Sequence, residues 1–367
     1  MKDRFVLQNV KMVDGNSVDI IVENRKIVDI VSAGTGCGDK IVNYKHKVFV
    51  SSGWIDMHVH AFPEFDPYGD DVDEIGYKTG VTTIIDAGST GADRLPDLVS
   101  SCKKSKTNVF AFVNIARIGL SRIDELSDLS WLDEDALKRA IAEHKDFIVG
   151  LKARISKSVV GSNGVEPLKI ARKFSKDTDL PLMVHIGSGP PDISDVLDLL
   201  EKKDIITHYL NGKANNLFNE NGKPLPKFLN AIKRGVHLDV GHGNASFSFQ
   251  TAIQAKKYGI HFDTISTDIY RKNRLNGPVY SMANVLSKFL YLGYSLEEVI
   301  DAVTVNAAKW LNKPALGRIA TGDTANLTLF TVEDEAISLL DSEGEERKTD
   351  QKIVVKGVVI NGEYIEC

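Results

Sequence analysis

The stretch Ser51–Phe62, SSGWIDMHVHAF, is an apolar segment that ends with two histidines, His58 and His60, separated by one valine. Successive side chains of a β-strand point to opposite faces, so residues two apart share a face. His58 and His60 therefore face the same way at the end of a predicted strand. Two neighbouring imidazoles in a buried place need a shared partner, and a metal ion is a common one. The stretch predicts a metal site if the chain supplies further ligands.

Short apolar runs continue this pattern through the middle of the chain. Plausible helices or long loops separate almost all of them from one another. The eight predicted strands are Trp54–His60, Thr82–Ala87, Val109–Ala116, Phe147–Ile155, Pro181–Ile186, Asp204–Leu210, His237–Gly241 and Asp263–Ile269. Eight strands that alternate with helices over about 250 residues are typical of a (β/α)8 barrel. An open, doubly wound sheet is the alternative.

Both ends of the chain are typical of β-structure. FVLQNVKMV and SVDIIVENRKIVDIVSAG near the N-terminus are rich in Val and Ile, as are TANLTLFTVE and QKIVVKGVVINGEYIE near the C-terminus. Neither end can bury a face separately, so we expect the two to pair. The sequence thus predicts an α/β fold in which residues 53–315 form a TIM-like barrel. Residues 1–52 and 316–367 are expected to form a small, composite β-sandwich domain.

The composition narrows the class of partner. The chain has 45 Lys and Arg against 50 Asp and Glu, a net charge of -5 that gives no electrostatic reason to expect nucleic acid or an anionic membrane. Its three cysteines have no paired spacing, so neither a disulfide framework nor a cysteine metal site is implied. The N-terminus becomes charged too soon for a signal peptide, and the apolar stretches are too interrupted for a membrane span. We expect a cytoplasmic protein with a small-molecule substrate; homo-oligomer formation stays open.

In a barrel of this kind, functional side chains lie at the C-terminal ends of the strands. This rule selects His58 and His60 on the first strand, Lys152 and Arg154 on the fourth, His185 on the fifth, His208 on the sixth and Asp268 on the eighth. A single histidine is more often an ordinary hydrogen-bonded residue. Four histidines at equivalent strand ends, with a lone lysine and a lone aspartate in apolar strands, indicate a metal centre.

Lys152 has two interpretations at this point. A buried ammonium group beside histidine-bound cations would be strongly disfavoured. In one interpretation the lysine pairs with Asp268 or with a substrate anion. In the other, the neutral amine reacts with carbon dioxide and becomes a carbamate, whose two oxygens can bridge two divalent cations.

The segments GWIDMHVH, VGLKAR, MVHIG, ITHYLNG and ISTD occur in this order, and LGRIATGDTANLTLF follows them. Together they resemble the amidohydrolase superfamily of metal-dependent hydrolases over essentially the whole chain. Within it the chain is similar to the dihydroorotase-like branch, and there most to the deacetylase-like members. The resemblance implies two divalent metal ions, which we expect to be zinc. The implied ligands are His58, His60 and Asp268 on the first metal, His185 and His208 on the second, and a carboxylated Lys152 between them.

The sequence also departs from the dihydroorotase pattern. In dihydroorotases an arginine that holds the substrate carboxylate usually follows the histidine pair, whereas here Ala61 and Phe62 follow it. This disfavours dihydroorotate as the substrate, although another cyclic amide stays possible. Deamination of adenine or guanine is less favoured, because a carbamate lysine is not typical of the deaminases of the superfamily.

The implied ligands predict a binuclear hydrolase that cleaves an amide or ester acyl bond of a small, anionic compound through a metal-bridging hydroxide. We expect Asp268 to take the proton of the bridging water and pass it to the leaving group. The alternatives are a cyclic amidohydrolase of dihydroorotase or hydantoinase type, an adenine-type nucleobase deaminase, and a scaffold without catalysis.

Three further residues have predicted roles near this centre. Arg154 is expected to hold an anionic group of the substrate, and a structural ion pair is the alternative. His242, just after the seventh strand, is expected to contact the substrate or to donate a proton. Asp56 points the same way as His58 and either orients a histidine or forms an inward salt bridge.

Overall fold

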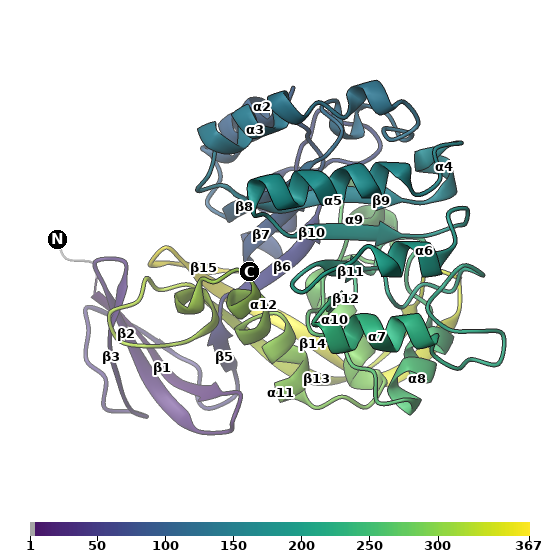
Figure 1. Ribbon diagram of the computed structural model, residues 1–367. Helices are drawn as coiled ribbons and strands as arrows, with labels where there is room; N and C mark the ends of the chain where they lie inside the picture. Colours follow the sequence, from purple (N-terminus) through teal and green to yellow (C-terminus); the bar gives the residue numbers. More distant parts are fainter. Residues whose placement is uncertain (1–3) are drawn as a thin grey trace.

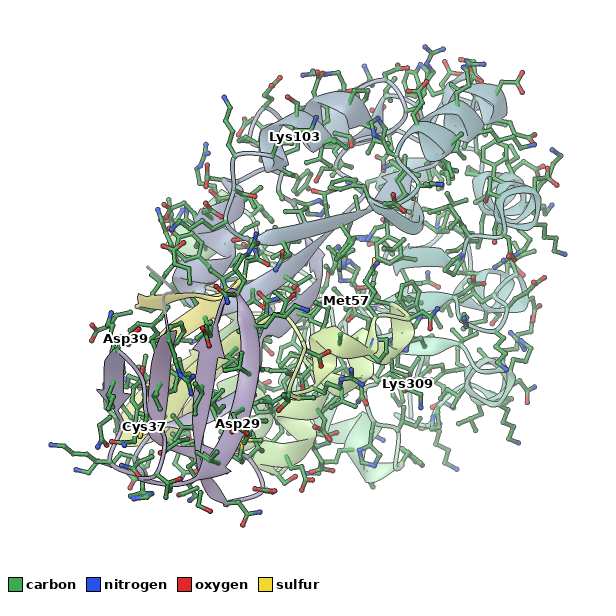
Figure 2. The ribbon with its side chains drawn as sticks, turned by 90° about the vertical axis from the view of Figure 1, so that its left-hand side faces the viewer. Asp29, Cys37, Asp39, Met57, Lys103 and Lys309 are labelled. Atoms are coloured by element: carbon green, nitrogen blue, oxygen red, sulfur yellow. The ribbon has the colours of Figure 1, made fainter. Side chains whose placement is uncertain are left out.

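The computed structural model describes residues 4–367, which form one parallel sheet surrounded by helices and one mixed sheet beside it (Figure 1). Residues 1–3, the start of the predicted composite domain, lie outside the described part. None of the helices in the described part combines the length and the apolar character that a membrane span requires. The three cysteines are free, and Cys37 lies exposed on the mixed sheet (Figure 2).

The parallel sheet is a nearly closed barrel of seven strands in chain order. These are β6 (Trp54–Val59), β7 (Val81–Ala87), β8 (Asn108–Asn114), β9 (Ile148–Ile155), β10 (Leu182–Ile186), β11 (Ile205–Thr207) and β12 (His237–Asp239). Their apolar outer faces pack on the surrounding helices, as Leu151 and Ala153 of β9 do. The structure confirms the predicted TIM-like barrel.

Helices follow the strands and cover the outside of the barrel (Figure 1). They are α1 (Val72–Ile75), α2 (Leu95–Cys102), α3 (Glu134–Glu143), α4 (Lys157–Val160), α5 (Glu166–Thr178), α6 (Ile193–Asp198), α7 (Pro226–Arg234), α8 (Phe249–Lys257), α9 (Arg271–Asn276), α10 (Met282–Tyr291), α11 (Leu296–Ala302) and α12 (Val305–Trp310). Several begin at a residue whose side chain accepts a hydrogen bond from the first turn, such as Asp133 before α3 and Ser295 before α11.

The eighth predicted strand, Asp263–Ile269, occupies the expected place but is not a regular strand. It closes the barrel between β12 and β6 through two isolated parallel bridges, Asp239 with Thr264 and Val59 with Ile269. Asp268 has a φ of +52°, which an extended strand does not allow. The prediction of a continuous strand was therefore wrong in conformation, although the segment supplies the closing contacts.

The mixed sheet takes strands from both ends of the chain, as predicted. The N-terminal strands are β1 (Arg4–Met12), β2 (Ser17–Glu23), β3 (Lys26–Ser32), β4 (Lys40–Asn43) and β5 (Phe49–Ser52), and the C-terminal ones are β13 (Leu327–Leu340), β14 (Glu346–Ile360) and β15 (Glu363–Glu366). The order is β15-β14-β13-β5-β1-β2-β3, with β4 beside β1. Leu7, Val50 and Leu329 contribute to a separate apolar core.

Strands β13 and β14 form a long hairpin whose far end leaves the mixed sheet and lies against the barrel (Figure 1). Leu339 and Ile353 of this far end are buried in the core of the barrel. The Ile353 backbone N donates to Ser287 Oγ on α10 at 2.9 Å. At the turn, Asp341 Oδ2 accepts a hydrogen bond of 3.0 Å from the backbone N of Phe249, the first residue of α8. The C-terminal segment thus reaches the barrel rim that follows β12.

Candidate metal centre

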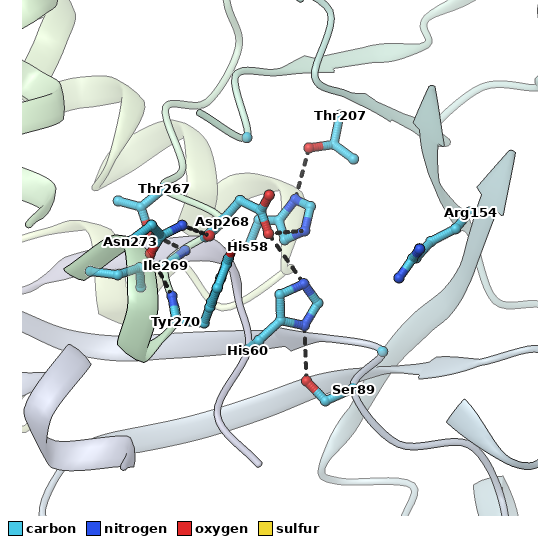
Figure 3. Close-up of polar contacts among 12 residues, drawn as sticks. His58, His60, Ser89, Arg154, Thr207, Thr267, Asp268, Ile269, Tyr270 and Asn273 are labelled. Atoms are coloured by element: carbon cyan, nitrogen blue, oxygen red, sulfur yellow. Dashed lines mark hydrogen bonds and ion pairs between the residues drawn. The ribbon is translucent and has the colours of Figure 1, made fainter. Parts of the chain in front are cut away.

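Three of the predicted ligands converge at the C-terminal end of the barrel (Figure 3). Asp268 Oδ1 lies 3.4 Å from His58 Nε2 and 3.1 Å from His60 Nε2. One ligand atom from each of the three residues lies within 4.8 Å of the others, which is close enough to share one metal ion. The segment that closes the barrel brings them together, because the backbone N of Asp268 donates to the carbonyl of His58 at 2.7 Å.

The Thr207 hydroxyl group orients the His58 ring through its Nδ1 atom. His58 Nδ1 lies 2.8 Å from Thr207 Oγ1, and Thr207 Oγ1 donates its proton to Asp239 Oδ2 at 2.8 Å. Because the hydroxyl gives its only proton to the carboxylate, it accepts the proton of His58 Nδ1. The lone pair of His58 Nε2 is then free for a metal ion.

The His60 ring has the same arrangement on the other side. His60 Nδ1 lies 2.9 Å from Ser89 Oγ, which donates to Asp86 Oδ2 at 2.7 Å. The supporting residues Ser89, Asp86, Thr207 and Asp239 were not predicted from the sequence. The signal that could have found them is a carboxylate at the end of an apolar run, since Asp86 and Asp239 lie near the ends of β7 and β12.

His185 and His208 form a second pair next to the first. Their ring centroids are 4.4 Å apart, and the His208 centroid lies 5.0 Å from that of His58. His208 Nδ1 donates to the carbonyl of Gly241 at 2.5 Å, whereas His208 Nε2 is buried without a hydrogen-bond partner. A buried nitrogen without a partner fits a site that takes a metal ion.

Burial keeps the rings of His58, His185 and His208 neutral, which metal binding requires. It lowers the pKa of His208 to about 3, against the attraction of Asp268. Burial, together with neighbouring cationic groups, also holds the pKa values of His58 and His185 well below the usual range. Burial acts on the pKa of Asp268 in the opposite direction. Burial works to raise its pKa, but the close contact with His60 and the nearby His208 outweigh it, so the pKa of this carboxyl lies below its ordinary value.

Lys152 is completely buried beside His58. Its Nζ lies 3.1 Å from His58 Nε2 and 3.4 Å from Met183 Sδ. Burial lowers the pKa of Lys152 to about 7, although Asp268 works in the opposite direction. A large share of the amine is therefore neutral near pH 7, and a neutral amine is a nucleophile.

Arg154 extends from β9 towards the histidines (Figure 3). Its Nε lies 3.4 Å from Oε1 of the buried Glu125, and its Nη2 donates to the carbonyl of Ile123 at 3.2 Å. Its guanidinium carbon also lies 5.6 Å from the centroid of the Tyr68 ring. The structural ion pair that the sequence left open is thus present, and the contact with a substrate anion stays a prediction.

His242 and Asp56 differ from their predicted roles. The His242 ring is fully buried; its Nδ1 lies 2.8 Å from the carbonyl of Gly243 and its Nε2 lies 2.8 Å from Lys288 Nζ. Both ring nitrogens are engaged, so the ring has no atom free for a substrate. Asp56 accepts hydrogen bonds from Thr267 Oγ1 at 2.5 Å and from the backbone N of His58 at 3.2 Å, and within residues 4–367 it forms no ion pair and no hydrogen bond with a histidine ring.

Comparison with known proteins supports one family. Residues 49–365 match the model of the Amidohydrolase family. A protein of Enterococcus faecalis named deacetylase is 40% identical over 364 residues, which cover 99% of each chain. A solved structure described as an adenine deaminase has 39% identity and a TM-score of 0.95, covering 99% of both chains. Another, described as a dihydroorotase, has 33% identity and a TM-score of 0.92, covering 99% of this chain and 98% of the other.

Proposed function

The chain belongs to the amidohydrolase family, and from that premise we propose that it is a binuclear metal-dependent deacetylase of a small, anionic compound. It is a hydrolase of amide or ester bonds. The observation that carries the proposal is the convergence of His58, His60 and Asp268 on one point beside the buried Lys152. The deacetylase name of the Enterococcus faecalis relative supports an acyl group as the part that is released.

We propose that two divalent ions, zinc in the first place, bind at this centre. The proposed ligands are His58, His60 and Asp268 for one ion, His185 and His208 for the other, and a carboxylated Lys152 for both. When bound, the ions would lower the pKa of a water molecule and polarise the scissile carbonyl. The unpartnered His208 Nε2 and the neutral histidine rings support this ligand set.

The carbamate follows from the state of the Lys152 amine. In its neutral form Nζ would attack the carbon of carbon dioxide. One N–C bond would form, the electron pair of one C=O π bond would move to oxygen, and the nitrogen would lose one proton to solvent water. The product is an anion with two oxygens, so it replaces a positive charge that the buried site disfavours with a negative charge that a cation site favours.

Asp268 is the proposed proton carrier. Its depressed pKa keeps it a carboxylate at neutral pH, and its Oδ1 lies 3.4 Å from His58 Nε2 and 3.1 Å from His60 Nε2. Such a group can accept a proton from the attacking water and return it to the leaving group. Arg154 is proposed to bind the anionic part of the substrate, while Glu125 and Ile123 fix the direction of its guanidinium.

A second candidate function is a cyclic amidohydrolase of dihydroorotase or hydantoinase type, or an adenine-type nucleobase deaminase. The two solved structures described above favour it, because they are about as similar to this chain as the deacetylase is. The absence of an arginine after His60 and the presence of Lys152 support the deacetylase instead.

One assay separates these functions. The zinc-loaded protein is incubated with acetylated hydroxy acids, acetylated amino acids, dihydroorotate, hydantoins and adenine. We expect acetate from at least one acetylated acid and no ammonia from adenine. Ring opening or ammonia release without acetate would replace the deacetylase with the second candidate. No turnover, together with fewer than about one bound ion per chain, would favour the scaffold.

The cellular location of the protein and the boundaries of its two domains are also proposed. We propose a cytoplasmic location, which the three free cysteines support, because disulfides are rare in that compartment. We keep residues 53–315 as the barrel domain and assign the two terminal segments to the composite domain, although the β13–β14 hairpin also contacts the barrel.

A further inference from the structure

The turn formed by residues 241–243 lies directly against Asp268. The backbone N of His242 donates to the carbonyl of Ser266 at 3.1 Å, and that of Gly243 donates to the carbonyl of Thr267 at 2.9 Å. A Cβ atom on Gly243 would lie 2.4 Å from Asp268 Oδ2. The backbone of Gly243 therefore packs closely against one face of the Asp268 carboxylate.

Two buried side chains hold the 241–243 turn from the barrel side. His242 Nδ1 can only donate to the Gly243 carbonyl, so His242 Nε2 is the acceptor for Lys288 Nζ. Lys288 Nζ also donates to the carbonyl of Pro278 at 2.8 Å, which fixes the ammonium end. The His242 ring stacks on Phe247 with centroids 4.5 Å apart and planes 21° apart. The turn thus has one fixed arrangement on this side.

The C-terminal hairpin holds the same turn from the other side. Ser342, in the turn between β13 and β14, donates through Oγ to the Gly243 carbonyl at 2.9 Å, with the His242 carbonyl at 3.3 Å. Asp341 fixes the tip by its hydrogen bond from Phe249, and the neighbouring Glu343 carboxylate packs against Gly212. The Gly243 carbonyl therefore accepts hydrogen bonds from both sides of the turn.

We propose that Lys288, His242 and Ser342 are positioning residues that press the 241–243 turn against Asp268 and fix the direction of its carboxylate. The hydrogen bonds of these three side chains go to the turn, to Pro278 and to one another, so we expect them to act through the turn. The inference rests on the proposed function in one respect, that Asp268 carries the proton. A carboxylate that rotates away from its reactive direction loses rate without losing substrate affinity.

The kinetic test uses the metal-loaded enzyme. We expect Ser342→Ala to lower kcat about three- to tenfold and Lys288→Met to lower it at least about tenfold, with KM within about twofold of the wild-type value. Ser342→Thr keeps the hydroxyl and is expected to restore kcat. Metal content is expected to equal that of the wild type in all three variants.

Two matched controls lie outside this network. Ser338→Ala removes an exposed hydroxyl from the same hairpin, where it donates a hydrogen bond to Glu346. Lys256→Met removes a partly buried ammonium whose hydrogen bond, 2.6 Å long, goes to the carbonyl of Leu292 and not to the 241–243 turn. Both controls are expected to keep the wild-type kcat.

A second test reads the metal-free protein. Nitrogen-15 NMR of the histidine rings, with the His242 signal assigned from His242→Gln, is expected to show the tautomer protonated at Nδ1. In Lys288→Met the Nε2 acceptor loses its donor, so a mixture of tautomers is expected. A wild-type ring protonated at Nε2 would overturn the proposed network.

The outcomes separate the inference from the proposed function. If the wild type releases acetate and both Ser342→Ala and Lys288→Met keep its kcat, the positioning role is wrong. A loss of kcat in proportion to lost metal would also overturn it. If Lys288→Met does not fold, Ser342→Ala and its threonine rescue decide. If the wild type hydrolyses no acyl compound, the proposed function is wrong. The NMR measurement of the His242 tautomer still tests the hydrogen bonds of Lys288 and His242 in that case.

Discussion

The buried amine of Lys152 is the residue on which the chemistry of the centre most depends. Lys152 is completely buried, and its Nζ lies 3.1 Å from His58 Nε2, a nitrogen with a free lone pair. A protonated lysine at this position would repel any cation that the histidines bind, whereas its carbamate would attract two. The pKa of about 7 gives the amine access to the neutral form that the reaction with carbon dioxide needs.

Replacing Lys152 by alanine is expected to abolish hydrolysis, with a loss of roughly a thousandfold or more, because the shared anionic ligand is lost. Bicarbonate with a short-chain acid is expected not to restore activity unless the cavity admits the acid. Steady-state kinetics with the best acetylated substrate measures the loss. Unimpaired turnover in Lys152→Ala would remove the carbamate bridge from the proposed mechanism.

Asp268→Asn tests the proton carrier separately from the metal site. The amide keeps an oxygen that can bind a cation but cannot take up a proton at neutral pH. We expect metal content close to that of the wild type and a loss of about 10²- to 10⁴-fold in kcat. Elemental analysis and kinetics on the same sample check both parts. A variant with the normal rate would show that another group moves the proton.

At this scale the sequence predicted which polar side chains lie at strand ends, but not how they are held. The spacing in HVH places His58 and His60 on one face, and the structure brings both to Asp268. Their supporting hydroxyls come from elsewhere in the barrel, Ser89 from the bend after β7 and Thr207 from the end of β11, and an isolated serine or threonine carries no signal of its own. His242 looked available because it follows a strand, yet the helix that buries it lies more than forty residues later.

At the scale of elements, the 241–243 turn can be tested through its glycine. Gly243 has a φ of +54°, and a Cβ there would lie 2.4 Å from Asp268 Oδ2. We expect Gly243→Ala to lower kcat at least about tenfold, because the methyl group must displace the carboxylate. Gly259→Ala is the matched control. Gly259 has a φ of +66°, and nothing lies within 4 Å of its Cβ position.

Gly259→Ala is destabilised by the same left-handed backbone strain, about 1 kcal/mol, but its methyl group does not contact the metal centre. A lowered melting temperature is therefore expected in both glycine variants, and a lowered kcat only in Gly243→Ala. Equal kcat values in the two variants would show that the turn does not govern the Asp268 carboxylate. Thermal unfolding and kinetics together make the comparison.

The elements themselves were largely predictable, and the exception has a physical cause. Apolar runs between turns gave the seven barrel strands, because both faces of such strands are buried. A strand was also predicted over Asp263–Ile269, but there the backbone N of Thr267 donates to the Asp56 side chain at 3.1 Å, outside any strand ladder. The left-handed conformation of Asp268 then ends any strand. Apolar periodicity cannot report a hydrogen bond to a distant side chain.

At the scale of the whole molecule, Lys288 links stability to pH. Burial lowers the pKa of Lys288 to about 7 in the folded protein, below its usual value of 10.5. Between these two pH values the unfolded chain binds a proton that the folded chain does not, so this group makes the free energy of unfolding rise with pH. The contribution is complete above pH 10.5 and is lost as the pH falls through about 7.

Replacing Lys288 by methionine is therefore expected to flatten the rise in stability between pH 7 and 9.5 relative to the wild type. The slope is the measurement that counts, since the variant also loses the hydrogen bonds to His242 and Pro278. Urea unfolding of both proteins at three pH values in that range gives the two slopes. Parallel slopes would show that Lys288 is charged in the folded protein across the range.

The pairing of β13 with β5 has a consequence for the order of events during synthesis. β5 is complete once residue 52 is made, but its neighbour on one side begins only at Leu327. Until the ribosome has released the last part of the chain, Val50 and the core around it have no cover from Leu327 and Leu329. A nascent chain halted before residue 327 would therefore carry an open sheet edge, a ready binding site for a chaperone, although all its barrel strands have been synthesised.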